Sequence, residues 1–371
     1  MIGRASDVRE IAASLGAGAH VVIAGPRRTG KTTVCDAVLS SLARRGAYTV
    51  AVDLFRISST AELAEVLVAR TISNRSALRR LVHQARRAGR LAADVAGTSA
   101  VVKTKGQLGE ELEIAFQPGL ASHDPERYLD YALELPTRIA AADNKRLVVF
   151  FDEFQEVASA QRPYGDPDRL TKRMRAIFQR STDVSYLFAG SIEHMMRELF
   201  AADRRALSQF GSFFELRSID ADDWAHGLRD RFAADDCTVD ERSLERLIEY
   251  GEGHPRATML IAQQTHLAAV LLETRAIDLD LVEQGYLSAL RAERVNNEQS
   301  LERIRRAHKL GLQVARRIAR REPAYRGLPR GAVRRALEEL RDAAIIETHG
   351  RGDWRFTNPL LRRFIDNLPT D

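Results

Sequence analysis

A glycine-flanked loop that ends in a lysine and a threonine is the first stretch of the sequence able to do chemistry. Residues 25–32 read Gly-Pro-Arg-Arg-Thr-Gly-Lys-Thr. In this pattern the glycines let backbone N–H groups surround phosphate oxygens, the lysine reaches the terminal phosphates, and the threonine hydroxyl ligates Mg²⁺. The loop therefore predicts a site for ATP and Mg²⁺. Its members are Gly25, Pro26, Arg27, Arg28, Thr29, Gly30, Lys31 and Thr32.

Two adjacent carboxylates form the second chemical feature. Asp152 and Glu153 directly follow the strand-like run 146–151. Because the carboxyl ends of parallel strands gather at one edge of a sheet, we expect both residues beside the phosphate loop. Asp152 is predicted to hold the Mg²⁺ shell, and Glu153 to orient and deprotonate an attacking water. A solvated turn is the alternative for such a pair. A second carboxylate also favours hydrolysis over transfer to a hydroxyl acceptor.

Alternating strands and helices are expected to position these residues. A β-branched run over 20–24 precedes the loop, and helical spacing over 31–44 follows it. The remaining strands are expected at 48–54, 146–151, 184–189 and 213–216, and the remaining helices at 7–15, 60–73, 125–142 and 170–180. This alternation predicts an α/β fold with a parallel sheet. From 218 to 295 the pattern is all-helical, and 296–371 has helices followed by a short hairpin.

Composition and charge narrow the class of protein. The formal net charge is +5, but residues 301–371 alone carry 17 Lys and Arg against 9 Asp and Glu. A basic end on a nearly neutral body predicts an acidic partner, with nucleic acid first. No apolar run approaches the roughly 20 residues of a membrane span, and the N-terminus lacks a signal core, so we expect a cytoplasmic protein with no membrane partner. The two cysteines form no CxxC pair, and the histidines lack metal spacing.

The basic end is predicted to fold as a winged helix-turn-helix. A helix over 328–340 precedes a hairpin whose turn lies at 349–352. Recognition-helix and wing residues of such a domain meet DNA phosphates and groove edges. The alternative is a solvated or protein-binding surface. The candidate DNA-binding residues are Arg330, Arg334, Arg335, Arg351 and Arg355.

In order along the chain, these motifs resemble those of the archaeal-type AAA-related ATPases, in the STAND class of P-loop NTPases. The phosphate loop, extended by Thr33, and the stretch LVVFFDEFQEV at 147–157 carry the most specific similarity. The resemblance implies an AAA+-like P-loop core, a helical lid and a winged helix. The expected bounds are 1–217 for the core, with an insertion carrying a hairpin at 74–123, then 218–295 for the lid and 296–371 for the winged helix.

Other site residues are implied by this resemblance alone. Ile2, Gly3 and Arg4 are similar to an N-terminal box that lies against the adenine. Ser191 ends the sensor strand, where many relatives carry asparagine. Pro255 is similar to the proline of the family's lid turn.

Two arginines are interpreted in two ways each. Arg256 follows Pro255 and is either a second γ-phosphate sensor or a lid surface residue. Arg205 resembles an arginine finger, which a neighbouring subunit supplies in a homo-oligomer; the alternative is an exposed arginine pair with Arg204.

Two functions remain open at this point. One is an ATPase whose nucleotide state repositions a DNA-bound winged helix. The other is a slow STAND-type signalling switch that uses the winged helix to contact a protein partner.

Overall fold

The chain forms two compact units in its computed structural model. One consists mainly of Asp7–Gly25 and Lys31–Glu215, and the other mainly of Met1–Ser6 and Leu216–Asp371. The structure describes residues 1–25, 29–75, 124–158, 166–216, 218–348 and 352–369, together with the backbone of 100–105 and 111–116. Pro26, Arg27, Arg28 and Arg351 lie outside these residues.

A five-stranded parallel sheet forms the centre of the first unit. Its order is β2-β5-β6-β1-β7, and every neighbouring pair runs parallel. The strands are β1 (Val21–Ala24), β2 (Tyr48–Asp53), β5 (Leu147–Asp152), β6 (Val184–Gly190) and β7 (Ser212–Phe214). The predicted α/β parallel sheet is confirmed. The strand β7 begins one residue earlier and ends two residues earlier than expected.

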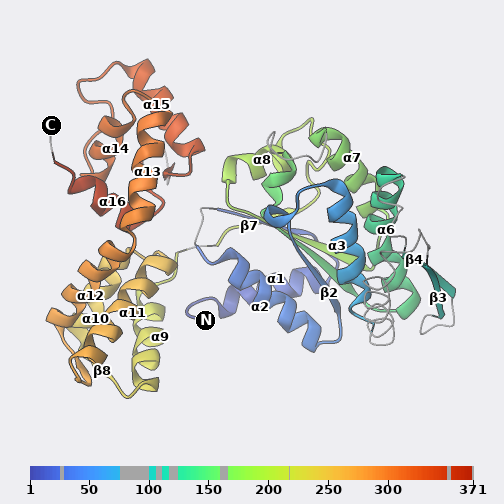
Figure 1. Cartoon of the computed structure of the whole chain (residues 1–371), viewed down its shortest axis with the longest axis horizontal. Coiled ribbons are helices and arrows are strands. Elements are labelled where there is room, and N and C mark those ends of the chain that lie inside the picture. Colours follow the sequence, from blue (N-terminus) through green and yellow to red (C-terminus); the bar gives the residue numbers. More distant parts are fainter. Residues whose placement is uncertain are drawn as a thin grey trace, which may run out of the picture. The chain divides into compact units, whose positions relative to one another are not determined.

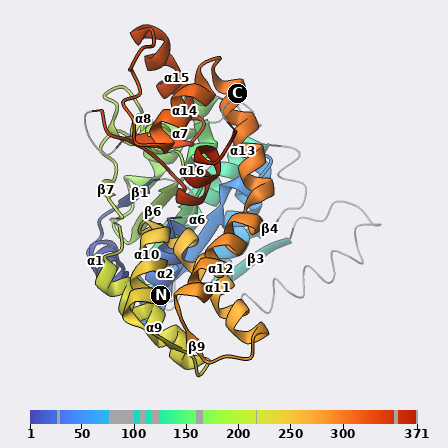
Figure 2. The same ribbon diagram turned by 90° about the vertical axis from the view of Figure 1, so that its left-hand side faces the viewer.

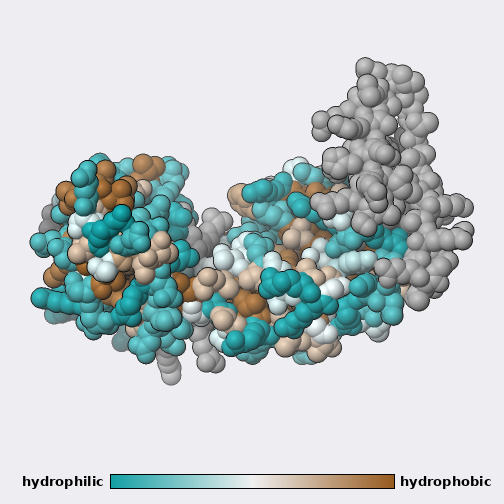
Figure 3. All heavy atoms as spheres, turned by 90° about the horizontal axis from the view of Figure 1, so that it is seen from below, coloured by the Kyte–Doolittle hydropathy of each residue, from teal (hydrophilic) through white to brown (hydrophobic). Residues whose placement is uncertain are grey.

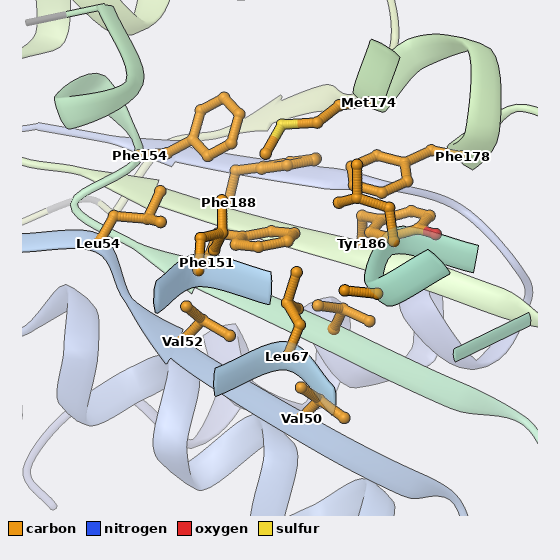
Figure 4. Close-up of a cluster of buried hydrophobic side chains, with 14 of the residues drawn as sticks. Val50, Val52, Leu54, Leu67, Phe151, Phe154, Met174, Phe178, Tyr186 and Phe188 are labelled. Carbon is orange, nitrogen blue, oxygen red and sulfur yellow. The ribbon is translucent and has the colours of Figure 1, made fainter. Parts of the chain in front are cut away.

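Helices cover both faces of this sheet (Figure 1). They are α1 (Ala5–Gly16), α2 (Lys31–Arg44), α3 (Thr60–Ile72), α6 (Pro125–Asp143), α7 (Pro167–Phe178) and α8 (Glu193–Ala201), with the short 3-10 helices η1 (Leu54–Arg56) and η2 (Phe154–Ala158). Because both faces are covered, β5 is buried at every residue from Leu147 to Phe151. Figure 4 shows aromatic side chains from β5, β6, η2 and α7 gathered on one face, among them Phe151, Phe154 and Phe188.

The predicted hairpin within 74–123 is present as backbone. The strands β3 (Ala100–Lys105) and β4 (Glu111–Phe116) pair antiparallel, with Ala100 opposite Phe116. Both strands lie within the expected insertion.

The second unit begins with four helices around their own apolar cluster. They are α9 (Ala221–Ala234), α10 (Glu241–Gly251), α11 (Pro255–Leu271) and α12 (Leu279–Ala292). Trp224, Leu228 and Ile261 are buried in this cluster. The expectation of an all-helical segment was incomplete, because β8 (Thr238–Val239) and β9 (Ala276–Ile277) form a short parallel pair. Two-residue strands give too little alternation to recognise in sequence.

The same unit ends with four helices and a hairpin around a further apolar cluster. The elements are α13 (Arg294–Ala307), α14 (Gly311–Ala319), α15 (Arg330–Asp342), β10 (Ile346–Thr348), β11 (Trp354–Phe356) and α16 (Pro359–Asp366). Figures 1 and 2 show the helices α13 to α16 gathered together. The antiparallel pair β10-β11 follows α15, which is the order expected of a winged helix.

Hydrophilic residues cover most of the described surface in the view of Figure 3, with apolar ones scattered among them. Among the described helices, none is long and apolar enough to cross a membrane.

A buried ion pair ties the end of α6 to the chain after α3. Arg75 donates to Asp143 through Nε at 2.6 Å and also through Nη2, and the two side chains are 9% and 2% exposed. Tyr48 of β2 donates a further hydrogen bond to Asp143 at 3.2 Å. Burying two charges costs free energy unless they stay paired. Removal of one partner therefore leaves the other as an uncompensated buried charge.

We therefore predict that Asp143→Ala lowers the free energy of unfolding by about 3–5 kcal/mol, as expected for a buried pair broken on one side. Urea unfolding followed by circular dichroism measures this. The matched control on the same helix is Glu134→Ala, which breaks an ion pair with Arg138 whose side chains are 41% and 50% exposed. That loss should stay below about 1 kcal/mol. Equal effects of the two changes would contradict the prediction.

Candidate active site

The phosphate-loop lysine lies at the first turn of α2. Lys31 is the first residue of this helix, is 6% exposed, and donates from Nζ to the carbonyl oxygen of Gly25 at 2.8 Å. Gly30 has φ +89°, a left-handed conformation that glycine adopts without strain. The first N–H groups of a helix have no partner within it, so the start of α2 favours an anion.

A hydrogen bond joins α2 to the end of β5. Thr32 donates from Oγ1 to Oδ2 of Asp152 at 2.8 Å. Asp152 is the last residue of β5, and its register partner in β2 is Asp53. The two predicted Mg²⁺ ligands are therefore in contact, although they are far apart in the sequence.

The environment of Asp152 suits a cation. Burial raises the pKa of its carboxyl group, and the negative charges of Glu153 and Asp53 raise it further. The Thr32 hydroxyl and the Glu153 N–H act in the opposite direction. Since a cation relieves the repulsion between carboxylates, and Mg²⁺ prefers oxygen ligands, the residues Thr32 and Asp152 fit this ion.

Glu153 is held in an unusual backbone conformation. Its φ is +51°, which costs a non-glycine residue roughly 1–3 kcal/mol and persists only where the surroundings enforce it. Its Oε2 accepts hydrogen bonds from Ser191 Oγ at 2.6 Å and from Gln155 Nε2 at 2.5 Å. Among the described residues, no side chain donates a hydrogen bond to its other oxygen, Oε1.

Residues 1–164 match the sequence model of a family described as the AAA ATPase domain. These residues form an AAA ATPase domain, and the protein is an ATPase. A search of curated proteins found no match.

Two solved structures share the fold of this ATPase. A Walker-type ATPase of Pyrococcus abyssi has 14% identity and a TM-score of 0.68, over 98% of this chain and 96% of that one. The Aeropyrum pernix ORC2 protein, in complexes with ADPNP and ADP, has 17% identity and a TM-score of 0.58, over 98% and 93% of the two chains. At such identities the likeness shows the fold alone.

The N-terminal box belongs to the second unit. A Cβ at Gly3, which has φ +61°, would lie 2.5 Å from Ile219, and one at Gly227 of α9 would lie 2.6 Å from Ile2. Arg4 is 5% exposed. The segment thus packs on the helices of the second unit, and its position in the sequence did not predict this placement.

The residues predicted for the lid turn lie at the start of α11 in the same unit. Pro255 is the first residue of this helix, and Arg256 donates to Glu293 at 2.7 Å. Arg256 also borders a cavity of about 460 Å³ between α9 and α11, together with Arg231 and Met259. Its side chain is 47% exposed.

The arginines predicted to contact a neighbouring subunit or DNA differ in whether they form ion pairs within the chain. Arg205 in the first unit donates to Asp168 at 2.8 Å and also to Glu198. In the second unit Arg334 pairs with Glu338, and Arg355 with Asp353, each at 2.9 Å. Arg330 and Arg335, both exposed on α15, make no ion pair with any described residue.

Two residues of the site were not predicted from the sequence. Asp53 lies beside Asp152, where its carboxylate caps η1 through Phe55 N–H and pairs with Arg56 at 3.0 Å. Its place at the end of a strand was the available signal. Gln155 is buried in η2 with only 1% exposure. Its local sequence gave no sign of burial among polar groups.

A glycine at the end of β6 leaves room for Gln155. A Cβ at Gly190 would lie 2.4 Å from Met196 Sδ and 2.6 Å from Gln155 Oε1. We predict that Gly190→Ala lowers the free energy of unfolding by about 1–3 kcal/mol through overpacking, and slows hydrolysis by displacing Gln155. Thermal unfolding and phosphate release measure the two effects. As a control, Gly16→Ala places a Cβ with nothing within 4 Å and should change neither. Wild-type behaviour of Gly190→Ala would contradict the prediction.

Proposed function

We propose that this ATPase hydrolyses Mg²⁺-bound ATP with Glu153 as general base, and that its nucleotide state repositions a basic winged helix on DNA. The observation that carries the hydrolytic part is the hydrogen bond between Thr32 and Asp152 at 2.8 Å, beside Glu153. This bond joins the predicted phosphate-binding loop to the end of β5, where the two carboxylates lie.

The chemistry follows from the roles of these groups. The oxygen of a water attacks the γ-phosphorus while Glu153 Oε1 accepts its proton. The bond to the bridging oxygen of ADP breaks, and phosphate leaves. Lys31 exchanges its bond with Gly25 for the β- and γ-phosphate oxygens. Thr32 and Asp152 would hold Mg²⁺, which neutralises charge on the phosphates when bound.

The remaining nucleotide contacts are proposed from the motif order. The loop residues Gly25–Thr33 surround the phosphates, with Arg27 and Arg28 beside them, and Ile2, Gly3 and Arg4 lie against the adenine. Ser191 and Arg256, which follows Pro255, sense the γ-phosphate. Arg205 acts as an arginine finger in a homo-oligomer, and this role requires its release from Asp168 and Glu198.

Contacts inside the second unit support coupling of the lid to the winged helix. Arg362 of α16 donates to Glu252 Oε1 from Nη2 at 2.6 Å and from Nε at 3.1 Å. Glu252 lies three residues before Pro255 in the lid turn. Leu360 of α16 is buried among the lid helices, whereas its neighbour Leu361 is buried in the C-terminal cluster. A movement of the lid would therefore carry the C-terminal module with it.

The DNA-binding part rests on exposed cations of α15. Arg330 and Arg335 are exposed and unpaired among the described residues, so they are free to meet phosphates. Arg334 and Arg355 already have carboxylate partners, which lowers their contribution. Because these two arginines already pair with carboxylates of the same chain, they favour the second candidate function, a slow switch whose winged helix contacts a protein.

We predict that Glu153→Gln keeps ATP binding and slows hydrolysis on the order of a hundredfold or more, because the general base is lost. Lys31→Ala should abolish binding or turnover. Phosphate release and fluorescent-nucleotide binding measure the two steps. Hydrolysis at the wild-type rate in Glu153→Gln would show that another group is the base.

We also predict that duplex DNA stimulates ATP turnover and that the double variant Arg330→Glu/Arg335→Glu loses this stimulation. A plot of the logarithm of the DNA-binding constant against the logarithm of the salt concentration should become less steep. Its slope should shrink by about one for each phosphate contact removed. The control Arg242→Glu/Arg291→Glu makes the same charge change at exposed residues of α10 and α12. It should retain stimulation. A slow rate that DNA leaves unchanged would favour the switch.

A further inference from the structure

Gln155 is a buried polar side chain whose partners are all site residues. It is 1% exposed, and its Nε2 donates to Glu153 Oε2 at 2.5 Å and more weakly to Ser191 Oγ at 3.4 Å. Its Oε1 accepts from the Ser191 N–H at 3.2 Å. Within the described part of the chain its side chain bonds to nothing else. A buried amide costs free energy unless it is satisfied, so the position of Gln155 depends on Glu153 and Ser191.

The position of Gln155 is also fixed from behind by packing. Its neighbour Phe154 is fully buried, with ring centroids 4.7 Å from Phe188 and 5.9 Å from Phe151. Figure 4 shows Phe154 above the sheet beside Phe188. On the other side Gly190 leaves the space that a Cβ would take from Gln155. The amide therefore has little freedom to move.

Both donors act on the same oxygen of Glu153. Ser191 and Gln155 engage Oε2 and leave Oε1 without a side-chain partner among the described residues. Since a carboxylate base uses one oxygen to take a proton, anchoring the other one orients it. The left-handed φ of Glu153 is consistent with a side chain held where an unrestrained residue would not stay.

We propose that Gln155 is a positioning residue for ATP hydrolysis, which anchors Glu153 Oε2 to the end of β6 and aims Oε1 at the attacking water. This inference rests on the proposed role of Glu153 as general base. Gln155 touches neither nucleotide nor water in this mechanism, and it acts through Glu153.

The test separates hydrogen bonding from packing. Gln155→Met keeps a long unbranched side chain and removes the amide, whereas Gln155→Asn keeps an amide too short to reach Glu153. Each should lower kcat about 10- to 100-fold, as expected when a catalytic group is misplaced. KM and fluorescent-ATP affinity should stay within about twofold of wild type. Gln179→Met, at the exposed glutamine that follows the last residue of α7, is the control and should leave kcat unchanged.

A double-variant comparison tests whether Gln155 works through Glu153. Single-turnover hydrolysis is measured for Gln155→Met, Glu153→Gln and both together. Because the anchor has no role once the base is gone, the double variant should hydrolyse ATP as slowly as Glu153→Gln alone. A purely structural role would give multiplied losses and a lowered melting temperature in both backgrounds.

Each outcome has a distinct meaning. A wild-type kcat in both Gln155→Met and Gln155→Asn, with Glu153→Gln still slow, overturns the positioning role and leaves the proposed base intact. Wild-type turnover by Glu153→Gln overturns the base and this inference with it. If Gln155→Met does not fold, the kcat and KM of Gln155→Asn decide the question.

Discussion

The burial of β5 on both faces is the constraint on which the rest of the site depends. A strand with covered faces tolerates a carboxylate only at its end, where the apolar run stops. Asp152 lies at that point, and its partial burial raises the pKa of its carboxyl group because burial disfavours the charged form. The hydroxyl of Thr32 and the N–H of Glu153 offset part of this cost. The remaining negative charge makes the place favourable for a cation.

The turn after β5 converts this constraint into orientation. Glu153 follows Asp152 with φ +51°, and Phe154 returns the chain into the aromatic cluster around Phe188. Such strain is stable only when packing and hydrogen bonds determine the conformation together. Here the aromatic cluster provides the packing, and Ser191 and Gln155 provide the hydrogen bonds.

The second unit shows a different kind of coupling. The helix α16 buries Leu360 among the helices α9 to α12 and Leu361 in the C-terminal cluster, so one helix belongs to both apolar clusters. The ion pair between Arg362 and Glu252 adds a polar link to the turn between α10 and α11. Two clusters that share a helix resist separate movement, because separation would expose apolar surface to water.

Local sequence determined the class of fold and much of the site's composition. The strand runs and the helix that begins at Lys31 are patterns of a few consecutive residues, and the structure reproduces their types with bounds shifted by a few residues. The sequence pattern did not predict β8 and β9, because strands of two residues show no alternation of apolar and polar residues. Only tertiary structure decided which distant groups meet. Far apart along the chain are the members of the pairs Gln155 and Ser191, Arg75 and Asp143, and Arg205 and Asp168. Their contacts arise from sheet order and helix packing, which depend on the summed burial of many side chains and not on any local pattern.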